Sequence, residues 1–304
     1  MQLFLMAGPT ASGKTALALH LAREIGGEIV GADALQLYRD LRILSARPSP
    51  EEEASAPHHL IGVADASEAW SVGRWLAAAG PVLEAIAGRG RPAIVVGGTG
   101  LYFRALTEGL VQLPAVPPGV RQAIQTRFDQ LGEASFRSEL AAADPVAEAR
   151  ISPGDRQRLA RALEVHAATG RALTDWQADA APAIARDYRA VVLEPPRATL
   201  YARCDARFRA MADAGALDEV RVLLARKLNP DLPAMKAVGV REFGAHLSGE
   251  VDLEAAVALG QQQTRRYAKR QTTWFRNQTA DWPRIAEADP EAQALRLATL
   301  WAPA

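Results

Sequence analysis

The first third of the chain alternates short apolar runs with segments whose apolar residues recur every three or four positions. We predict buried strands in the runs and helices in the periodic segments, the first helix lying over 16–25. The strands are QLFLMA (2–7), EIVGAD (28–33) and AIVV (93–96), and the other helices are 71–90, interrupted near Gly80-Pro81, and a segment after Gly100. Residues 45–57 hold three prolines and three consecutive glutamates and are predicted to form a solvated loop. Strands that alternate with helices predict a parallel, doubly wound sheet.

The pattern changes after the proline-rich segment LPAVPPG (113–119), which we interpret as a linker. Residues 119–170 carry helical patterns only, and Asp144-Pro145 is typical of a helix start. The apolar run YRAVVLEPPR (188–197) returns to the strand pattern, and helices are predicted beyond it over 198–227, 237–247 and 252–277. The fold class is therefore α/β, a P-loop parallel sheet flanked by helices with an inserted all-helical module. We assign 1–112 to the first part of the α/β core, 113–187 to the inserted module, and 188–304 to the core completion and basic C-terminal helices.

Composition and charge narrow the class of protein. The 304 residues are 49% hydrophobic and 23% charged, as in globular proteins, and a formal net charge of zero means that any basic surface must be local. The single cysteine, Cys204, excludes a disulfide framework and a cysteine-rich zinc site. The opening MQLFLMA lacks a basic segment, and no apolar run approaches the roughly 18 residues that span a bilayer. We expect a monomeric cytoplasmic protein with no membrane segment.

The segment GPTASGKT (8–15) has the spacing G-x-x-x-x-G-K-[ST] of an ATP-binding phosphate loop. In such a loop the backbone N–H groups from about Ala11 to Thr15 converge on phosphate oxygens at a helix N-terminus. Lys14 would reach the terminal phosphate, and the Thr15 hydroxyl would bind Mg²⁺. The plainer alternative is a glycine turn that only packs the helix on the strand. The residues expected to bind phosphate are Gly8, Thr10, Ala11, Ser12, Gly13, Lys14 and Thr15.

A second acid that would hold Mg²⁺ in an NTP hydrolase or kinase is missing. The apolar strand AIVV ends in GGTG (97–100), where Thr99 offers only a neutral hydrogen bond, and this weakens the NTPase interpretation. The acid that does occur at a strand end is Asp33. Because the carboxyl ends of parallel strands form the ligand crevice, Asp33 is expected to face the phosphate loop and Thr99, although a lone aspartate there is also a common cap or turn residue. Three positions further on, the amide of Gln36 could read an adenine edge.

Basic residues concentrate in TRRYAKRQTTWFRNQ (264–278), which contains no acid. On a helix, positions 266, 269, 270 and 273 share one face, so we predict a basic stripe with Tyr267, Trp274 and Phe275 packing partly inward. Such a stripe can neutralise phosphates and stack unpaired bases, but an ordinary solvated helix has the same composition. DRQRLARALEV (155–165) presents Arg158 and Arg161 in the same way, with the same alternative.

Together these motifs resemble the tRNA dimethylallyltransferase family. The resemblance extends over nearly the whole chain, through GPTASGKT (8–15), DALQLY (33–38), HHLI (58–61), SVGRW (71–75), GGTGLYFRALTEGL (97–110), DPVAEARISPGDRQRLARALEVHAATG (144–170), LYARCDARFRAM (200–211) and TRRYAKRQTTWFR (264–276). The sequence departs from the family pattern at Ala34, where Ser is usual, at Gly62, in ILSARP (43–48) and in VGVR (238–241). These departures affect local contacts more than the reaction, because Lys14, Asp33, Gln36 and Thr99 are present.

The resemblance implies transfer of a dimethylallyl group from dimethylallyl diphosphate to N6 of the adenine just 3′ of the anticodon, with Mg²⁺ as cofactor. It places Asp33, as general base, and Thr99 in the catalytic centre, and adds Arg203 or Arg207, without a choice between them, to the diphosphate site. The residues that it assigns to tRNA contact are Asp33, Ala34, Leu35, Gln36, Thr99, Arg121, Gln157, Arg158, Leu159, Ala160, Arg161, Lys236, Gly239, Arg241, Arg265 and Arg266. The inserted helical module would embrace the anticodon stem.

Three other functions share parts of this pattern. A small-molecule phosphotransferase would use the same loop for ATP, but the missing acid and the basic C-terminal helix disfavour it. An adenylate isopentenyltransferase that acts on free nucleotides would have little use for the helical insertion. A third is a non-catalytic RNA-binding protein with a vestigial loop, and Asp33→Ala distinguishes it from an enzyme, because this change should leave tRNA affinity nearly intact but abolish transfer.

Overall fold

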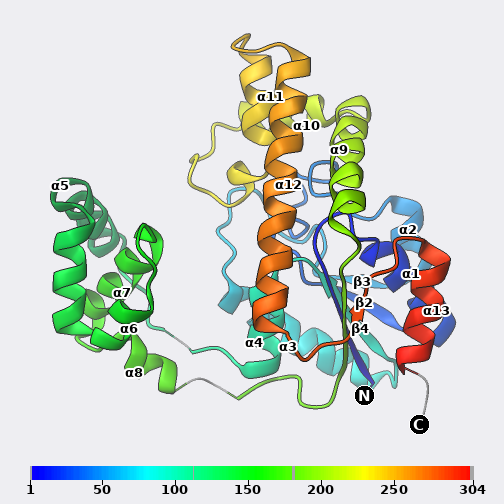
Figure 1. The fold of residues 1–304 in the computed structure, drawn as a ribbon, viewed down its shortest axis with the longest axis horizontal. Coiled ribbons are helices and arrows are strands. Elements are labelled where there is room, and N and C mark those ends of the chain that lie inside the picture. Colours follow the sequence, from blue (N-terminus) through cyan, green and yellow to red (C-terminus); the bar gives the residue numbers. More distant parts are fainter. Residues whose placement is uncertain (1, 112, 180–181, 302–304) are drawn as a thin grey trace. The chain divides into compact units, whose positions relative to one another are not determined.

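The computed structural model describes residues 2–111, 113–179 and 182–301, and the larger of its two compact units is built on one parallel sheet (Figure 1). Its six strands are ordered β3-β2-β4-β1-β5-β6, and every pairing is parallel. The strands are β1 (Leu3–Ala7), β2 (Glu28–Gly31), β3 (His58–His59), β4 (Ala93–Gly97), β5 (Arg189–Leu193) and β6 (Arg284–Ile285). The predicted α/β fold with a parallel sheet flanked by helices is confirmed.

Alternate residues of the strands enter two separate cores, which is why both faces of the sheet are covered. Leu5 of β1 packs in the core beneath helices α3 (Val72–Gly88) and α4 (Gly100–Glu108). Its neighbour Met6 enters the other core, with α1 (Lys14–Ile25) and α13 (Pro290–Trp301). A strand buried on both sides reads as a continuous apolar run, and this explains why β1, β2 and β4 were recognisable in the sequence.

The second half of the same unit is helical and completes the first core. Its helices are α9 (Arg197–Asp213), α10 (Ala216–Ala225), the 3₁₀ turn η1 (Ala234–Lys236), α11 (Val240–Leu247) and α12 (Leu253–Gln278). The helix α12 lies beside α9 and is the longest straight element drawn in Figure 1 near the sheet. The predicted segment 198–227 is two helices, because Gly215 with φ +100° separates α9 from α10.

Two sequence predictions about α2 and α3 are wrong. Residues 45–57 are not only loop, since Pro50–Ser55 form helix α2, begun by a capping box in which Ser49 accepts from the Glu52 N–H. That signal is local, and the proline and glutamate content concealed it. Helix α3 continues through Gly80-Pro81 without a break. Its buried face, which includes a fully buried Trp75, outweighs the hydrogen bond that the proline removes.

The chain divides into two compact units, Met1–Thr107 with Ala185–Ala304 and Glu108–Ile184. The second contains α5 (Pro118–Ala143), α6 (Pro145–Arg150), α7 (Arg156–Thr169) and α8 (Leu173–Ala178) around its own apolar core. Asp144 caps α6 as its sequence predicts, by accepting a hydrogen bond of 2.9 Å from the Ala147 N–H. Within the described ranges, no helix has both the length and the apolar character needed to cross a membrane.

Candidate active site

The phosphate loop follows β1 and ends at Gly13, the N-cap of α1. Gly13 has φ +99° and Ala11 has φ +63°, conformations that turn successive N–H groups toward one side of the loop. Ala11 packs against α9 and α12, so the turn is supported from outside. Ser12 is fully buried, and its N–H donates to the Pro9 carbonyl at 3.3 Å, so this residue shapes the turn from within.

Lys14 lies buried at the start of α1, where its Nζ donates to the Pro9 carbonyl at 3.2 Å. Burial lowers the pKa of Lys14 to about 8, because the ammonium loses hydration, while the carboxylate of Asp33 opposes this shift. Arg207 is a second cation near Lys14, and burial lowers its pKa as well. Lys14 and Arg207 are thus two desolvated cations close to each other, an arrangement that suits an anionic ligand.

Asp33 lies just beyond the carboxyl end of β2, and the end of β4 holds the loop that carries it. The Thr99 N–H donates to the Ala32 carbonyl at 3.2 Å, and the Ala34 N–H donates to Thr99 Oγ1 at 2.9 Å. Asp33 Oδ1 accepts from the Leu35 N–H at 3.0 Å. Thr99 therefore keeps its own proton to donate, and Asp33 keeps its other oxygen for a substrate.

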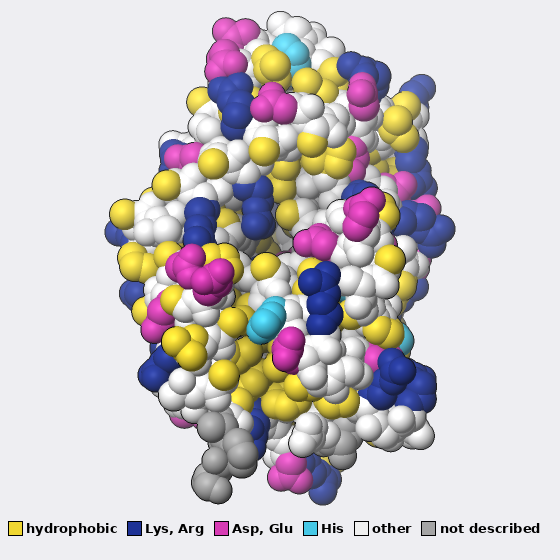
Figure 2. Space-filling model, turned by 90° about the vertical axis from the view of Figure 1, so that its right-hand side faces the viewer, with side chains coloured by type: hydrophobic (Ala, Val, Ile, Leu, Met, Phe, Trp, Pro, Cys, Tyr) yellow, Lys and Arg dark blue, Asp and Glu magenta, His cyan; other side chains and the backbone are white. Residues whose placement is uncertain are grey.

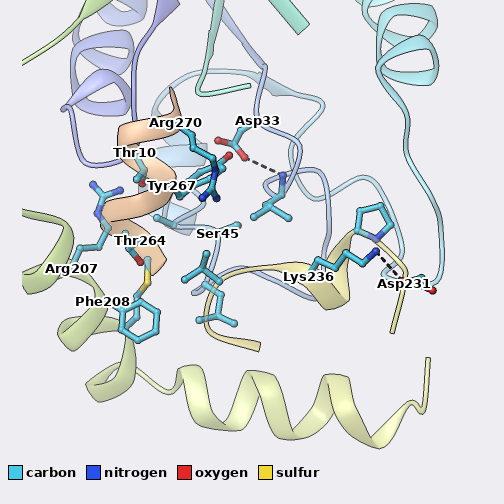
Figure 3. A pocket seen from close by; sticks show the side chains of 16 residues that line it. Thr10, Asp33, Ser45, Arg207, Phe208, Asp231, Lys236, Thr264, Tyr267 and Arg270 are labelled. Carbon is cyan, nitrogen blue, oxygen red and sulfur yellow. Dashed lines mark hydrogen bonds and ion pairs between the residues drawn. The ribbon is translucent and has the colours of Figure 1, made fainter. Parts of the chain in front are cut away.

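Two cavities meet at Asp33. A polar one of about 210 Å³ is lined by the phosphate loop, including Lys14 and Thr15, and an apolar one of about 460 Å³ includes Leu44, Phe208 and Met211 in its wall. Both are lined by Thr10, Asp33, Ser45, Ala46 and Arg207. Figure 3 shows the larger cavity, with Asp33 close to Tyr267 and Arg270 and Arg207 near Thr10.

The hydroxyls of Tyr102 and Tyr267 are close enough to Asp33 to feel its charge. Burial, reinforced by the Asp33 carboxylate, raises the pKa of both phenols. Tyr102 is stacked on Trp75 with ring centroids 4.4 Å apart, and Tyr267 makes a cation–π contact with the Arg270 guanidinium, which lies 5.7 Å from its ring centre. Both tyrosines therefore stay protonated at neutral pH as possible hydrogen-bond donors.

The structure separates the two candidate arginines of α9. Arg207 lines both cavities, whereas Arg203 points toward the C-terminal segment and donates to the Ala288 carbonyl at 2.6 Å. Gln36 lies at the edge of the polar cavity, but its amide nitrogen donates to the carbonyls of Ser45 and Ala46 at 3.2 and 3.0 Å. Reading an adenine edge through this amide would require breaking those bonds.

Two glutamines that sequence reasoning missed hold the phosphate loop from behind. Gln271 of α12 accepts from the Thr10 N–H at 2.8 Å and donates to the Gly98 carbonyl at 2.9 Å, so it joins the phosphate loop to the loop before Thr99. Gln293 of α13 donates to the Ser12 carbonyl at 3.0 Å. Both are almost fully buried. Their only sequence signal is a polar residue on the inward face of an otherwise apolar helix pattern.

Charged side chains of both signs are interspersed over the face drawn in Figure 2, as the zero net charge suggests. The expected tRNA contacts of the first unit therefore have to be assessed singly. Lys236 lines the apolar cavity and pairs with Asp231 at 3.0 Å, and Arg241 and Arg266 are exposed. Gly239 is the N-cap of α11 with φ +103° and is buried against Leu44, so its role is to form the turn that begins this helix. Arg265 pairs with Asp205 of α9.

The expected tRNA contacts of the second unit lie on α7 and at the start of α5. Gln157 and Arg158 are exposed, and Arg158 pairs with Asp155 at 3.0 Å. Leu159 and Ala160 are buried in the core of that unit, so their side chains face away from any ligand. Arg161 and Arg121 reach the same carboxylate, Glu164, at 3.4 and 3.8 Å. The surface available to RNA on this segment therefore consists of arginines and Gln157.

The fold and the site define a P-loop α/β protein with an anion site that opens into an apolar cavity beside a carboxylate. Comparison with known proteins makes this class specific. The profile of the family described as IPP transferase matches residues 36–278, and one described as isopentenyl transferase matches residues 1–59. This chain belongs to the IPP transferase family.

Relatives that have been named support the assignment. The tRNA dimethylallyltransferase of Phenylobacterium zucineum (strain HLK1) is 64% identical over 292 residues, which cover 96% of this chain and 95% of that protein. Among solved structures, the tRNA isopentenylpyrophosphate transferase of Bacillus halodurans is 32% identical, with a TM-score of 0.71 over 99% of this chain and 95% of that one. A eukaryotic dimethylallyltransferase acting on tRNA has a TM-score of 0.84 at 25% identity, over 98% of this chain and 78% of that one.

Proposed function

We propose that this protein transfers the dimethylallyl group of dimethylallyl diphosphate to N6 of the adenine 3′-adjacent to the anticodon of tRNAs. One observation carries the proposal: a cavity built for an anion and an apolar cavity share a wall, and Asp33 stands in that wall. A substrate with a charged diphosphate and a short hydrocarbon tail matches this division. The family membership and the names of the relatives support the same reaction.

The diphosphate would lie in the polar cavity, against the loop N–H groups, Lys14 and Arg207. Negative charge builds up on the diphosphate as the allylic carbon leaves, so cations that are already desolvated stabilise the transition state more than they would in water. Arg207 is assigned to this contact because it lines the cavity, and Arg203 does not.

A magnesium ion fits this site only with help from the substrate. Within residues 2–111, 113–179 and 182–301 there is no group of three or more His, Cys, Asp or Glu side chains that could hold a metal. Thr15 lines the polar cavity and offers one hydroxyl ligand. Mg²⁺ commonly keeps several waters and takes its remaining ligands from phosphates. When bound, it would supply additional positive charge to the departing diphosphate.

Asp33 would act as the general base. The lone pair of the adenine N6 attacks the allylic carbon, the bond between that carbon and the diphosphate oxygen breaks, and the N6 proton passes to the free oxygen of Asp33. Thr99 Oγ1 accepts from the Ala34 N–H and so holds the segment that carries this carboxylate, and the single hydroxyl proton of Thr99 would be donated to the bridging oxygen. The target base reaches the cavity by leaving its stack, which costs a few kcal/mol.

The test is incubation with labelled dimethylallyl diphosphate and unmodified tRNA, followed by nucleoside analysis. Asp33→Asn should slow transfer by roughly 10²- to 10⁴-fold while both substrates still bind, because only the proton acceptor is lost. Asp213→Asn, at an exposed position of α9, is the matched control and should transfer normally. Transfer that persists in Asp33→Asn would refute the role of Asp33. Tight ATP binding without affinity for dimethylallyl diphosphate would favour a phosphotransferase instead.

A further inference from the structure

The five basic residues between 264 and 278 divide into two groups by their partners. Arg265 pairs with Asp205, and Arg276 pairs with Glu194, so both hold α12 to neighbouring segments. The other three are Arg266, Lys269 and Arg270, and no ion pair is found for them in the part of the chain that the structure describes. These three exposed cations lie on one face of α12, and such a local concentration of positive charge suits an anionic ligand.

These three cations line a surface cavity of about 470 Å³ together with Trp274 and Asn277. The position of Trp274 is fixed by its packing. A Cβ added to Gly100 would lie 2.1 Å from the indole, so only glycine lets the ring lie this close to the first turn of α4. The Phe275 ring supports it edge-on, with centroids 5.2 Å apart. The result is a rigid aromatic surface bordered by positive charge and an amide.

This cavity, which we call the α12 cavity, adjoins the active site. Arg270 lines both the α12 cavity and the apolar cavity that contains Asp33. Trp274 follows Arg270 by four residues of the same helix, which is about 6 Å along its axis. That displacement is comparable to the step between neighbouring nucleotides in an extended strand. A base seated near Asp33 would leave its neighbour in reach of Trp274.

We propose that the α12 cavity binds an unpaired RNA nucleotide directly next to the target adenosine. Its base stacks on the Trp274 indole, and its phosphates are neutralised by Arg266, Lys269 and Arg270. Aromatic stacking with adjacent cations is the usual way in which proteins hold single-stranded RNA. The inference rests on the proposed function, since it requires the target adenosine to occupy the cavity beside Asp33.

The experiment measures binding of an anticodon stem-loop RNA, without dimethylallyl diphosphate, to the wild type, Trp274→Leu and Trp274→Phe. Three RNAs are compared: the intact one, and two with a single abasic nucleotide on the 5′ or the 3′ side of the target. Trp274→Leu should weaken binding of the intact RNA by roughly 5- to 150-fold, and Trp274→Phe by less. One of the abasic RNAs should bind the wild type as weakly as the intact RNA binds Trp274→Leu. The same abasic RNA should bind Trp274→Leu no more weakly than it binds the wild type. Unchanged binding of dimethylallyl diphosphate shows that each variant is folded.

A pair of charge variants on the same helix tests the phosphate contact. Lys269→Gln should lower the salt dependence of RNA binding by about 0.7 in log–log slope, whereas Arg276→Gln, which removes an equal charge outside the cavity, should leave it unchanged. If each abasic substitution weakens binding to Trp274→Leu as much as it weakens binding to the wild type, the stacking site is overturned, even when dimethylallyl transfer is normal. If the effect of Trp274→Leu disappears with one of the abasic RNAs but the protein transfers no dimethylallyl group, only the proposed function is overturned.

Discussion

Gln271 links the two loops on which the reaction depends, and its replacement by Met offers a sharp test of how the site is assembled. Its amide accepts from the Thr10 N–H and donates to the Gly98 carbonyl, and only 6% of the residue is exposed. Met has nearly the same length and fills the same space but can make neither hydrogen bond. Gln271→Met therefore removes the polar link without leaving a large cavity.

The expected loss follows from the surroundings of the two backbone groups. Gly98 is buried, so its carbonyl would be left unsatisfied, at a cost of about 1–3 kcal/mol. Thr10 is only partly buried, so water can replace the lost acceptor there and the cost is roughly 1 kcal/mol. We expect the free energy of unfolding to fall by about 2–4 kcal/mol. Because Thr10 and Thr99 would no longer be held in register, kcat should fall roughly 10- to 100-fold, with the affinity for RNA unchanged.

The assay combines urea unfolding with steady-state transfer kinetics. Gln262→Met, an exposed position on the same helix, is the control and should change neither quantity appreciably. If Gln271→Met unfolds within about 0.5 kcal/mol of the wild type and keeps its kcat, the link is not needed and the reasoning fails. A loss of stability at unchanged kcat would show that Gln271 supports the fold but does not position the reacting groups.

Three further predictions concern charge and packing. Burial lowers the pKa of Lys14 from 10.5 to about 8, so between these pH values Lys14 is protonated in the unfolded chain but deprotonated in the folded protein. The contribution of Lys14 to the free energy of unfolding therefore rises with pH through that window. Affinity for dimethylallyl diphosphate, measured by calorimetry without RNA, should fall over the same window, and an equal fall in Lys14→Met would contradict the assignment. The hydrogen bond from Arg89 lowers the pKa of buried Glu28 from 4.5 to about 2, so this pair stabilises the fold above pH 4.5 and its contribution is lost as the pH falls toward 2. Arg89→Gln should therefore cost roughly 1–3 kcal/mol at pH 7 and progressively less in acid, as seen by thermal unfolding; a loss independent of pH would speak against the pair. A Cβ on Gly260 would lie 2.0 Å from the Phe208 ring, which lines the apolar cavity, so Gly260→Ala should lower the free energy of unfolding by about 1–3 kcal/mol. A Cβ on Gly88 meets nothing within 4 Å, so Gly88→Ala should raise the free energy of unfolding by up to about 1 kcal/mol. Similar effects of the two substitutions would show that the Phe208 ring can move aside.

The parts of the site that were predictable from the sequence are those formed by residues close together in the chain. A phosphate loop is set by the spacing of its glycines, Lys14 and Thr15, and Asp33 follows directly from an apolar strand. Because all strands of the sheet are parallel, their carboxyl ends had to share one edge, so the meeting of the loop, Asp33 and Thr99 could be expected before the structure was known. The roles of these residues in the reaction stay predictions until the variants are measured.

What the sequence alone determined was thus the fold class and the chemistry at the strand ends, because both depend on local spacing and on alternation along the chain. The tertiary structure alone decided which distant side chains support that chemistry. Arg203 and Arg207 occupy adjacent turns of one helix face, and only their neighbours distinguish them: Ala288 engages the first, and the two cavities receive the second. Gln271 lies 261 positions from Thr10 and 173 from Gly98, and no periodicity in the chain encodes a contact between residues so far apart. Such contacts exist only after the helices have packed on the sheet, since it is packing that brings an otherwise ordinary amide to two backbone groups at once.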